Sequence, residues 1–269
     1  MFRRPGALFM NYTSRIRPNA KSRVQYCTDK GKIRRNNEDY CGCYMPEDEK
    51  IEQNLGSLFA VSDGVGGSHA GEVASSEAVN VLLQEYYFGN HTAKCPERLK
   101  SAFQFTALHI YDLAETSGIC NKMMCTLTAL LLKGKKFYIS HVGDSKVFLL
   151  RGGELIQLTK DQTIVGKMLR MGLINREQAR THPSRHVLLR SLGERPILPA
   201  DFYSGNLQAG DLFFLSTDGI FEHVSEEEIK DFLLSGKQAS EGIGSLIKLA
   251  NSRGGEDNMT VMTVAPAFS

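Results

Sequence analysis

Residues 126–158 decide the fold and read TLTALLLKGKKFYISHVGDSKVFLLRGGELIQL. Four runs rich in aliphatic, aromatic and β-branched residues occupy 126–133, 136–141, 146–151 and 154–158. Glycine-containing segments at 133–135 and 151–153 separate the first run from the second and the third from the fourth, as hairpin turns do. This stretch therefore predicts a β-meander in the middle of the chain.

Strand and helix signals elsewhere in the chain are grouped instead of alternating. Further strands are expected at 24–27, 39–44, 58–62, 212–215 and 260–264. Helices are expected at 71–87 and 97–116, packed as an antiparallel pair. Near the C-terminus, Ser225 and Glu228 form a capping box before a helix, and another helical stretch ends before Gly254. This grouping indicates an α+β fold of antiparallel sheets with helices on their outer faces.

The composition excludes several classes of protein. The 269 residues include 32 basic and 30 acidic side chains, and no long basic tract is interleaved with aromatics, so nucleic acid is a poor partner. No apolar run approaches the roughly 20 residues needed to span a membrane. The six cysteines show no CxxC spacing, which excludes a zinc ribbon. Because no secretory segment is visible, we expect a cytoplasmic protein with reduced thiols.

The domain organisation follows from length and composition. An apolar content of 42% is near the globular average, so a single domain is expected over residues 23–266. Residues 1–22 contain basic side chains and no acid, a composition shared by transit peptides and disordered tails, and we favour a flexible basic leader. The stretch 161–186 is amphipathic but interrupted by Gly166 and Gly172, which predicts a partly helical insertion beside the sheets.

Three apolar strands end in an aspartate, namely Asp63, Asp144 and Asp218, while Glu38 and Asp257 each stand ahead of a strand. If these strand ends converge, the like charges raise one another's pKa or require a cation. Oxygen-only ligand sets select hard ions such as Mg²⁺ and Mn²⁺. A single Asp-Gly pair more often marks a turn, but several after apolar strands favour a metal site.

Five motifs stand in order along the chain. They are Thr28-Asp29-Lys30-Gly31 with Arg34-Arg35-Asn36-Asn37-Glu38-Asp39, Asp63-Gly64-Val65-Gly66-Gly67 with Gly71-Glu72, Val142-Gly143-Asp144-Ser145, Ser216-Thr217-Asp218-Gly219, and Gly255-Glu256-Asp257-Asn258-Met259-Thr260. In these motifs the chain resembles the metal-dependent protein phosphatases of type 2C, and its DGxGG form is similar to their bacterial branch. The resemblance implies a four-layer β-sandwich, with two antiparallel sheets flanked by antiparallel helix pairs.

The resemblance also implies the reaction and the two central ions. A hydroxide bridging two Mn²⁺ or Mg²⁺ ions would hydrolyse phosphoserine and phosphothreonine on proteins, because the ions lower the pKa of the water and neutralise developing charge. Asp63 would bridge the ions. Asp218 and Asp257 would complete the coordination of the first ion. Glu38 and the carbonyl of Gly64 would be ligands of the second.

Two further roles come from the same resemblance. Asp144 together with Asp218 would hold a weaker third ion. Arg34 would bind the phosphate of the substrate, since a guanidinium can donate two hydrogen bonds to a phosphate group. The residues expected to carry catalysis are therefore Arg34, Asp63 and Asp218, and no nucleophilic Cys or Ser is expected.

The chain departs from the family pattern at places that remove none of these ligands. Some relatives have a histidine where Val65 stands, so the leaving group must gain its proton in another way. His69 and His141 are the nearest histidines, and a structural role is the commoner reading for either. Residues 162–186 correspond to the family's flap, which either gates substrate access or is a passive surface element.

Three functions remain open at this point. They are a protein phosphatase, a small-molecule phosphoesterase and a phosphoprotein-binding pseudophosphatase. The complete carboxylate set disfavours the pseudophosphatase, because replacing Asp63 or Asp218 would remove the metal bridge or its main anchor. We expect a monomer that acts on phosphorylated proteins and opposes a cognate bacterial Ser/Thr kinase.

Overall fold

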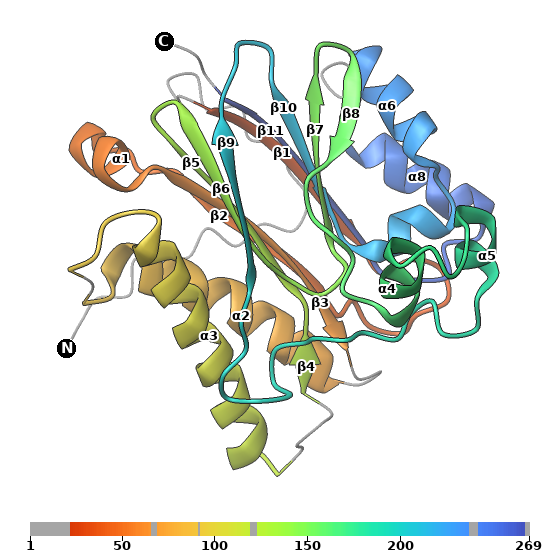
Figure 1. The fold of residues 1–269 in the computed structure, drawn as a ribbon, viewed down its shortest axis with the longest axis horizontal. Helices are drawn as coiled ribbons and strands as arrows, with labels where there is room; N and C mark the ends of the chain where they lie inside the picture. The colour runs from red at the N-terminus through yellow and green to blue at the C-terminus, as the bar shows by residue number, and fades with distance from the viewer. Residues whose placement is uncertain (1–21, 66–68, 91, 119–122, 237–241, 267–269) are drawn as a thin grey trace.

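The computed structural model describes residues 22–65, 69–90, 92–118, 123–236 and 242–266. Two antiparallel sheets make up its centre (Figure 1). The first sheet has the strand order β1 (Ser22–Asp29), β11 (Met259–Pro266), β10 (Leu212–Ser216), β7 (Lys146–Arg151) and β8 (Glu154–Gln157). The second has the order β2 (Asp39–Tyr44), β3 (Ser57–Val65), β5 (Leu127–Lys133), β6 (Lys136–Val142) and β9 (Asp201–Asn206), with β4 (Met124–Cys125) paired to β3.

Helices cover the outer face of each sheet (Figure 1). The long helices α2 (His69–Phe88) and α3 (Glu97–Thr116) lie over the second sheet, and α6 (Glu226–Leu234) and α8 (Gly244–Arg253) lie over the first. The shorter elements are α1 (Glu49–Leu55), α4 (Ile164–Arg170), α5 (Arg176–Thr181) and the 3-10 helix η1 (Asp218–Glu222). The capping box of Ser225 and Glu228 at the start of α6 is present as predicted.

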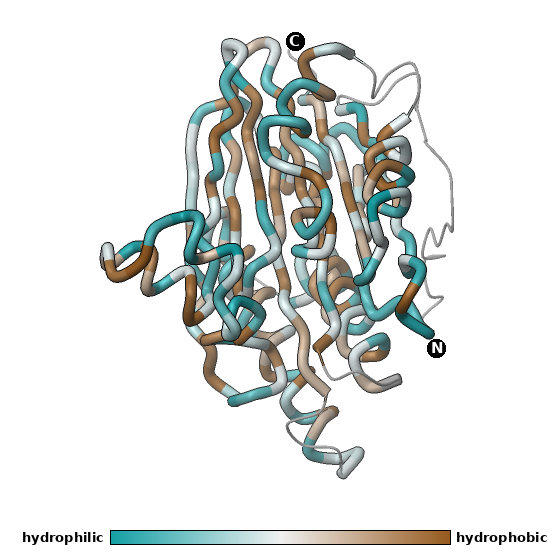
Figure 2. Tube along the Cα trace, turned by 90° about the vertical axis from the view of Figure 1, so that its right-hand side faces the viewer, coloured by the Kyte–Doolittle hydropathy of each residue, from teal (hydrophilic) through white to brown (hydrophobic). Residues whose placement is uncertain are grey.

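Three apolar clusters hold the four layers together. One cluster joins α2 and α3 to the second sheet through side chains such as Leu82, Phe103 and Leu127. A second fills the space between the sheets, and a third joins the first sheet to α6 and α8. Figure 2 shows hydrophobic residues alternating with others along the strands in the middle of the molecule. The predicted α+β sandwich of two antiparallel sheets flanked by helix pairs is confirmed.

The mid-chain strands depart from the prediction, because they do not form one meander. β5 and β6 pair in the second sheet, whereas β7 and β8 pair in the first. The chain changes sheets after β6, at Gly143, whose φ of 109° lies in the region that favours glycine. This crossing carries Asp144 to the end of the sandwich, where it meets other strand ends.

Several boundaries and elements also differ from the sequence predictions. Strand β1 begins at Ser22, which pairs with Pro266, so this residue does not belong to the predicted leader. The rest of that leader, residues 1–21, lies outside the described residues. Strand β9 and helix α1 were not predicted. The insertion at 162–186 contains two short helices, α4 and α5, as the interrupted pattern indicated. Across the described ranges, no helix is long and apolar enough to cross a membrane.

Candidate metal centre

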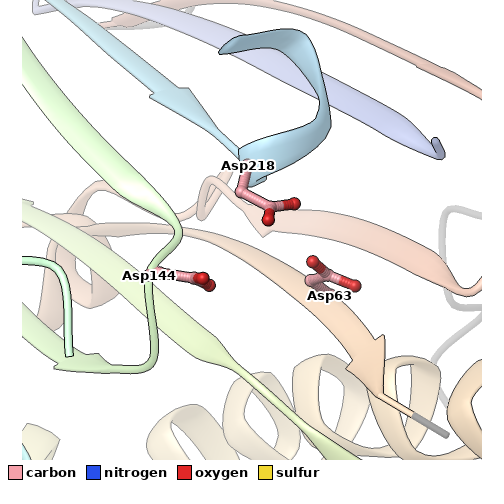
Figure 3. A group of neighbouring side chains, drawn as sticks. All are labelled: Asp63, Asp144 and Asp218. Atoms are coloured by element: carbon pink, nitrogen blue, oxygen red, sulfur yellow. The ribbon is translucent and has the colours of Figure 1, made fainter. Parts of the chain in front are cut away.

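Three aspartates converge at one end of the sandwich (Figure 3). Asp63 lies near the end of β3, Asp144 follows β6, and Asp218 opens η1 directly after β10. One carboxylate oxygen from each lies within 4.8 Å of the others. Figure 3 shows the three side chains pointing toward a common space. Three of the carboxylates predicted from strand ends are thus brought together by the fold.

The electrostatics of this cluster are those of crowded carboxylates. Burial, reinforced by neighbouring negative charge, raises the pKa of Asp63 and that of Asp144 well above the ordinary value. Burial also pushes the pKa of Asp218 upward, but the interaction with the His186 imidazole 3.7 Å away holds it below the usual range. A bound cation would favour the ionised form of all three carboxylates.

Gly64 and Gly71 form a tight contact beside the cluster. A Cβ atom at Gly64 would lie 2.3 Å from the carbonyl oxygen of Gly71, and one at Gly71 would lie 2.6 Å from Oε2 of Glu38. The backbone N–H of Gly64 donates to the carbonyl of Glu38 at 3.0 Å. Only glycine therefore permits this approach, which brings Glu38 close to the end of β3.

Asp257 and Arg34 lie at the more exposed side of the site. Nη2 of Arg34 donates to Oδ2 of Asp257 at 2.9 Å, and the Arg34 side chain is 48% exposed. Burial alone would lower the pKa of Arg34, but the Asp257 carboxylate raises it. Neither Asp257 nor Glu38 belongs to the tight group of Asp63, Asp144 and Asp218. A partly exposed guanidinium beside carboxylates is available to an anionic substrate.

Asp39 is a further carboxylate that the sequence analysis did not select. It is 5% exposed and stands directly opposite Asp63 in the register of β2 and β3. Its Oδ2 accepts a hydrogen bond from Oγ1 of Thr217 at 2.7 Å, whereas its Oδ1 has no hydrogen-bond partner among the described residues. Burial raises the pKa of Asp39 to about 7. The sequence signal was its place in Asn37-Glu38-Asp39, but only strand pairing shows its proximity to Asp63.

His186, at the end of the predicted flap, lies beside the cluster. Its Nδ1 lies 3.7 Å from Oδ2 of Asp218 and its Nε2 lies 3.7 Å from Oε1 of Glu222. His141 is buried, bonded to Oγ1 of Thr128 at 2.8 Å, and burial lowers its pKa to about 4. The structural reading of His141 is therefore favoured. The side chain of His69 lies outside the described residues.

The donor set of this site fits a hard divalent cation. The grouped ligand atoms are carboxylate oxygens, with no sulfur or imidazole among the three clustered residues. The unpartnered Oδ1 of Asp39 and the raised pKa values show negative charge that protein donors do not compensate. Mg²⁺ and Mn²⁺ take such oxygen ligands. The residues present fit the ions that the sequence predicted.

A sequence profile described as "Protein phosphatase 2C" matches residues 27–166. The serine/threonine phosphatase Stp of Listeria welshimeri is 35% identical over 244 residues, which cover 90% of this chain and 94% of that protein. The chain belongs to the protein phosphatase 2C family. The motif-based resemblance to the bacterial metal-dependent phosphatases is confirmed.

Solved structures of this family support the same assignment. The serine/threonine phosphatase PstP/Ppp of Mycobacterium tuberculosis superposes with a TM-score of 0.79 at 32% identity, over 92% of this chain and 99% of that chain. A structure of the catalytic domain of PstP in complex with two manganese ions gives a TM-score of 0.76 at 32% identity, over 90% and 97% of the two chains. These values show that this chain has the type 2C phosphatase fold.

Proposed function

We propose that this chain is a metal-dependent protein phosphatase that hydrolyses phosphoserine and phosphothreonine, with residues 23–266 as one catalytic domain. The observation that carries the proposal is the convergence of Asp63, Asp144 and Asp218 within 4.8 Å. The related Stp and PstP proteins bear the name serine/threonine phosphatase. PstP binds two manganese ions in its crystal structure, and the oxygen donor set here suits Mn²⁺ or Mg²⁺.

The central pair of ions has a proposed ligand set in this chain. Asp63 would contribute to both ions, Asp218 and Asp257 would hold one, and Glu38 with the carbonyl of Gly64 would hold the other. When bound, the cations supply Lewis acidity that activates water and neutralises phosphate charge.

The remaining roles fall to Asp144 and Arg34. Asp144, with Asp218, would hold a weaker third ion. Arg34 orients the phosphate, because its guanidinium is partly exposed and lies at the edge of the carboxylates. In the reaction, a water oxygen bonds to phosphorus, the bond from phosphorus to the serine or threonine oxygen breaks, and that oxygen gains a proton.

The flap at 162–186 favours a protein substrate over a small ester. Its exposed residues include Met171 and Leu173, which are 62% and 63% exposed. Its end contacts the metal centre, since Arg185 and His186 reach Glu222 and Asp218. Exposed apolar side chains on a segment that ends at the site are available for contact with a polypeptide. We propose that this flap receives the polypeptide around the phosphorylated residue and gates its access.

Phosphate release from a phosphothreonine peptide and from p-nitrophenyl phosphate tests the activity. Each reaction is run with Mn²⁺, with Mg²⁺ and with EDTA. Metal-dependent hydrolysis of the peptide is the expected result. Turnover of only the small ester would instead indicate a small-molecule phosphoesterase. Binding of the phosphopeptide without turnover of either compound would indicate a pseudophosphatase.

The cellular setting is part of the same proposal. We propose a cytoplasmic monomer that opposes a cognate Ser/Thr kinase, because a Ser/Thr phosphatase reverses the reaction of such a kinase. Light scattering after size exclusion should give the 29.9 kDa mass of one chain. Capture from the native host with the Asp63→Asn variant should retain phosphorylated proteins and a kinase, and recovery of neither would refute this partner assignment.

A further inference from the structure

The loop between β1 and β2 carries a run of positive charge beside the metal centre. Residues 30–36, here named the basic loop, read KGKIRRN and contain four basic side chains and no acid. All four basic residues are exposed, and Ile33 in their midst is 69% exposed. The side chains of this loop are therefore accessible to a polypeptide that binds at the site.

Hydrogen bonds fix the backbone of the basic loop at both ends and in the middle. The side-chain nitrogen of Asn258 donates to the carbonyls of Lys30 and Asn36, each at 2.9 Å. The backbone N–H of Lys32 donates to the carbonyl of Gly255 at 2.7 Å. A surface that is already ordered loses less conformational entropy when it binds a partner. The loop thus presents its charges on a fixed backbone.

Most of the charge on the basic loop is not neutralised within the protein. Arg34 pairs with Asp257 at 2.9 Å. In the part of the chain that the structure describes, neither Lys32 nor Arg35 lies within ion-pair distance of a carboxylate. Positive charges held this close together repel one another, and an anionic partner relieves that repulsion. Lys32 and Arg35 are therefore available to negative groups on a bound molecule.

These two cations flank the residue proposed to bind the phosphate. Burial lowers the pKa of Arg34, but the carboxylates of Asp257 and Glu38 raise it, so its guanidinium lies beside the metal centre. Because consecutive Cα atoms are about 3.8 Å apart, the Cα atoms of Arg35 and Lys32 lie within about 4 Å and 8 Å of that of Arg34. An extended peptide advances about 3.3 Å per residue. Acidic residues one to three positions from the phosphorylated residue are thus within reach of the long Lys32 and Arg35 side chains.

We propose that the basic loop binds acidic residues flanking the phosphorylated serine or threonine, so that phosphorylation sites in acidic sequences are the preferred substrates. This inference rests on the proposed phosphatase function and adds the class of sequence that the site selects. Arg34 takes the phosphate, while Lys32 and Arg35 pair with the neighbouring carboxylates. Charge pairs at an exposed surface are screened by salt, so the preference depends on ionic strength.

Three phosphothreonine peptides of equal length test the preference in the full-length protein with saturating Mn²⁺. They carry aspartate, asparagine or lysine at the two positions on each side of the phosphothreonine. At low ionic strength kcat/KM should be about tenfold higher for the aspartate peptide than for the lysine peptide, with the asparagine peptide between them. The difference should shrink as the salt concentration rises from about 0.05 M to about 0.5 M.

Charge reversal assigns the preference to the basic loop. Lys32→Glu and Arg35→Glu should each lower the ratio of kcat/KM for the aspartate peptide to that for the lysine peptide by about fivefold. Both values come from the same enzyme, so general damage to the metal centre cancels in this ratio. Lys50→Glu is the matched control and should keep the wild-type ratio, because Lys50 is exposed on α1, which leads into the start of β3, about 20 Å along that strand from Asp63.

The possible outcomes separate this inference from the proposed function. Equal kcat/KM for the three peptides in the wild-type enzyme would overturn the inference and leave the phosphatase activity standing. The same holds if both loop variants keep the wild-type ratio. Phosphate release from none of the peptides and none from p-nitrophenyl phosphate would overturn the proposed function and this inference with it.

Discussion

The side-chain oxygen of Asn258 accepts a hydrogen bond from the backbone N–H of Glu38 at 2.8 Å, across 220 positions of sequence. The amide nitrogen of Asn258 donates to the carbonyls of Lys30 and Asn36, each at 2.9 Å. One side chain therefore fastens the loop that carries Arg34 and Glu38 to the segment that carries Asp257. It orients residues on both sides of the site without belonging to the clustered carboxylates.

Replacing Asn258 by alanine should disorder this junction. We expect a loss of about 10- to 100-fold in Mn²⁺ affinity, typical of losing a group that orients metal ligands. Unfolding in urea should show a destabilisation of about 2–4 kcal/mol from three lost hydrogen bonds. Asn175→Ala removes the exposed N-cap of α5 and is the control, which should leave the affinity intact. Unchanged calorimetric titrations for Asn258→Ala would show that the junction does not organise the site.

Replacing a central carboxylate should have opposite effects on catalytic activity and on stability. Asp63→Asn and Asp218→Asn should each abolish phosphate release, because the proposed ions lose their bridge or main anchor. Without metal, Asp63→Asn should melt a few degrees higher than wild type, since repulsion among buried carboxylates is relieved.

Asp112→Asn provides the control for these two variants. Asp112 is an exposed residue of α3, so its replacement should change neither activity nor melting temperature. Retained turnover in Asp63→Asn or Asp218→Asn would remove that residue from the proposed ligand set.

The strand ends could be predicted from the sequence because local patterns specify them. Asp63, Asp144 and Asp218 each follow an apolar run, and antiparallel sheets in a sandwich can bring such ends together. Likewise, α3 was predicted at Glu97–Thr116 because its apolar residues repeat at helical spacing. These features can be predicted from local sequence, without knowing which distant segments of the chain come into contact.

Other features depend on tertiary contacts that no local pattern specifies. Strand β9 contains Asp, Ser, Gly and Asn, which are poor strand formers, and it is held at the sheet edge by pairing with β6. Helix α1 has no buried residue and is capped by Asp48, so it lacks an apolar periodicity. Asp39 reaches the site only through the register of β2 against β3. His186 reaches it only because the flap folds against η1.

Asp144 is expected to influence turnover more than binding of the central ions. Asp144→Ala should lower the rate of phosphate release while two ions remain bound, because the proposed role of this carboxylate is in the weaker third site. Metal analysis after gel filtration and calorimetric titration with Mn²⁺ would measure the stoichiometry. Loss of both central ions from Asp144→Ala would contradict this division of roles.

The stability of the metal-free protein should fall as the pH rises from about 4 to about 7. The pKa of Asp39 is raised to about 7, and those of Asp63 and Asp144 are also raised well above the ordinary value, so in this range the native state holds protons that the unfolded chain has lost. These three carboxyl groups outnumber the opposing contribution of His141, whose pKa is lowered to about 4 by burial. The lowered pKa of Asp218 acts only at lower pH.

Urea unfolding in EDTA across this pH range measures the effect. Asp63→Asn should flatten the dependence by up to about 1.4 kcal/mol per pH unit. With saturating Mn²⁺ the slope should reverse, because ion binding releases the protons. A metal-free protein that gains stability over the same range would refute the proposed proton uptake.

The flap should affect protein substrates selectively. Met171 and Leu173 are exposed on the segment whose end contacts Glu222 and Asp218. The double change Met171→Ser and Leu173→Ser should lower kcat/KM for a phosphothreonine peptide by about tenfold, the effect of removing apolar contacts worth 1–2 kcal/mol. Hydrolysis of p-nitrophenyl phosphate should stay unchanged, because this ester is too short to reach those side chains. Leu234→Ser, at a 49% exposed position on α6, is the matched control. Equal losses on both substrates would place the defect in the metal centre, and no loss on either would make the flap a passive surface element.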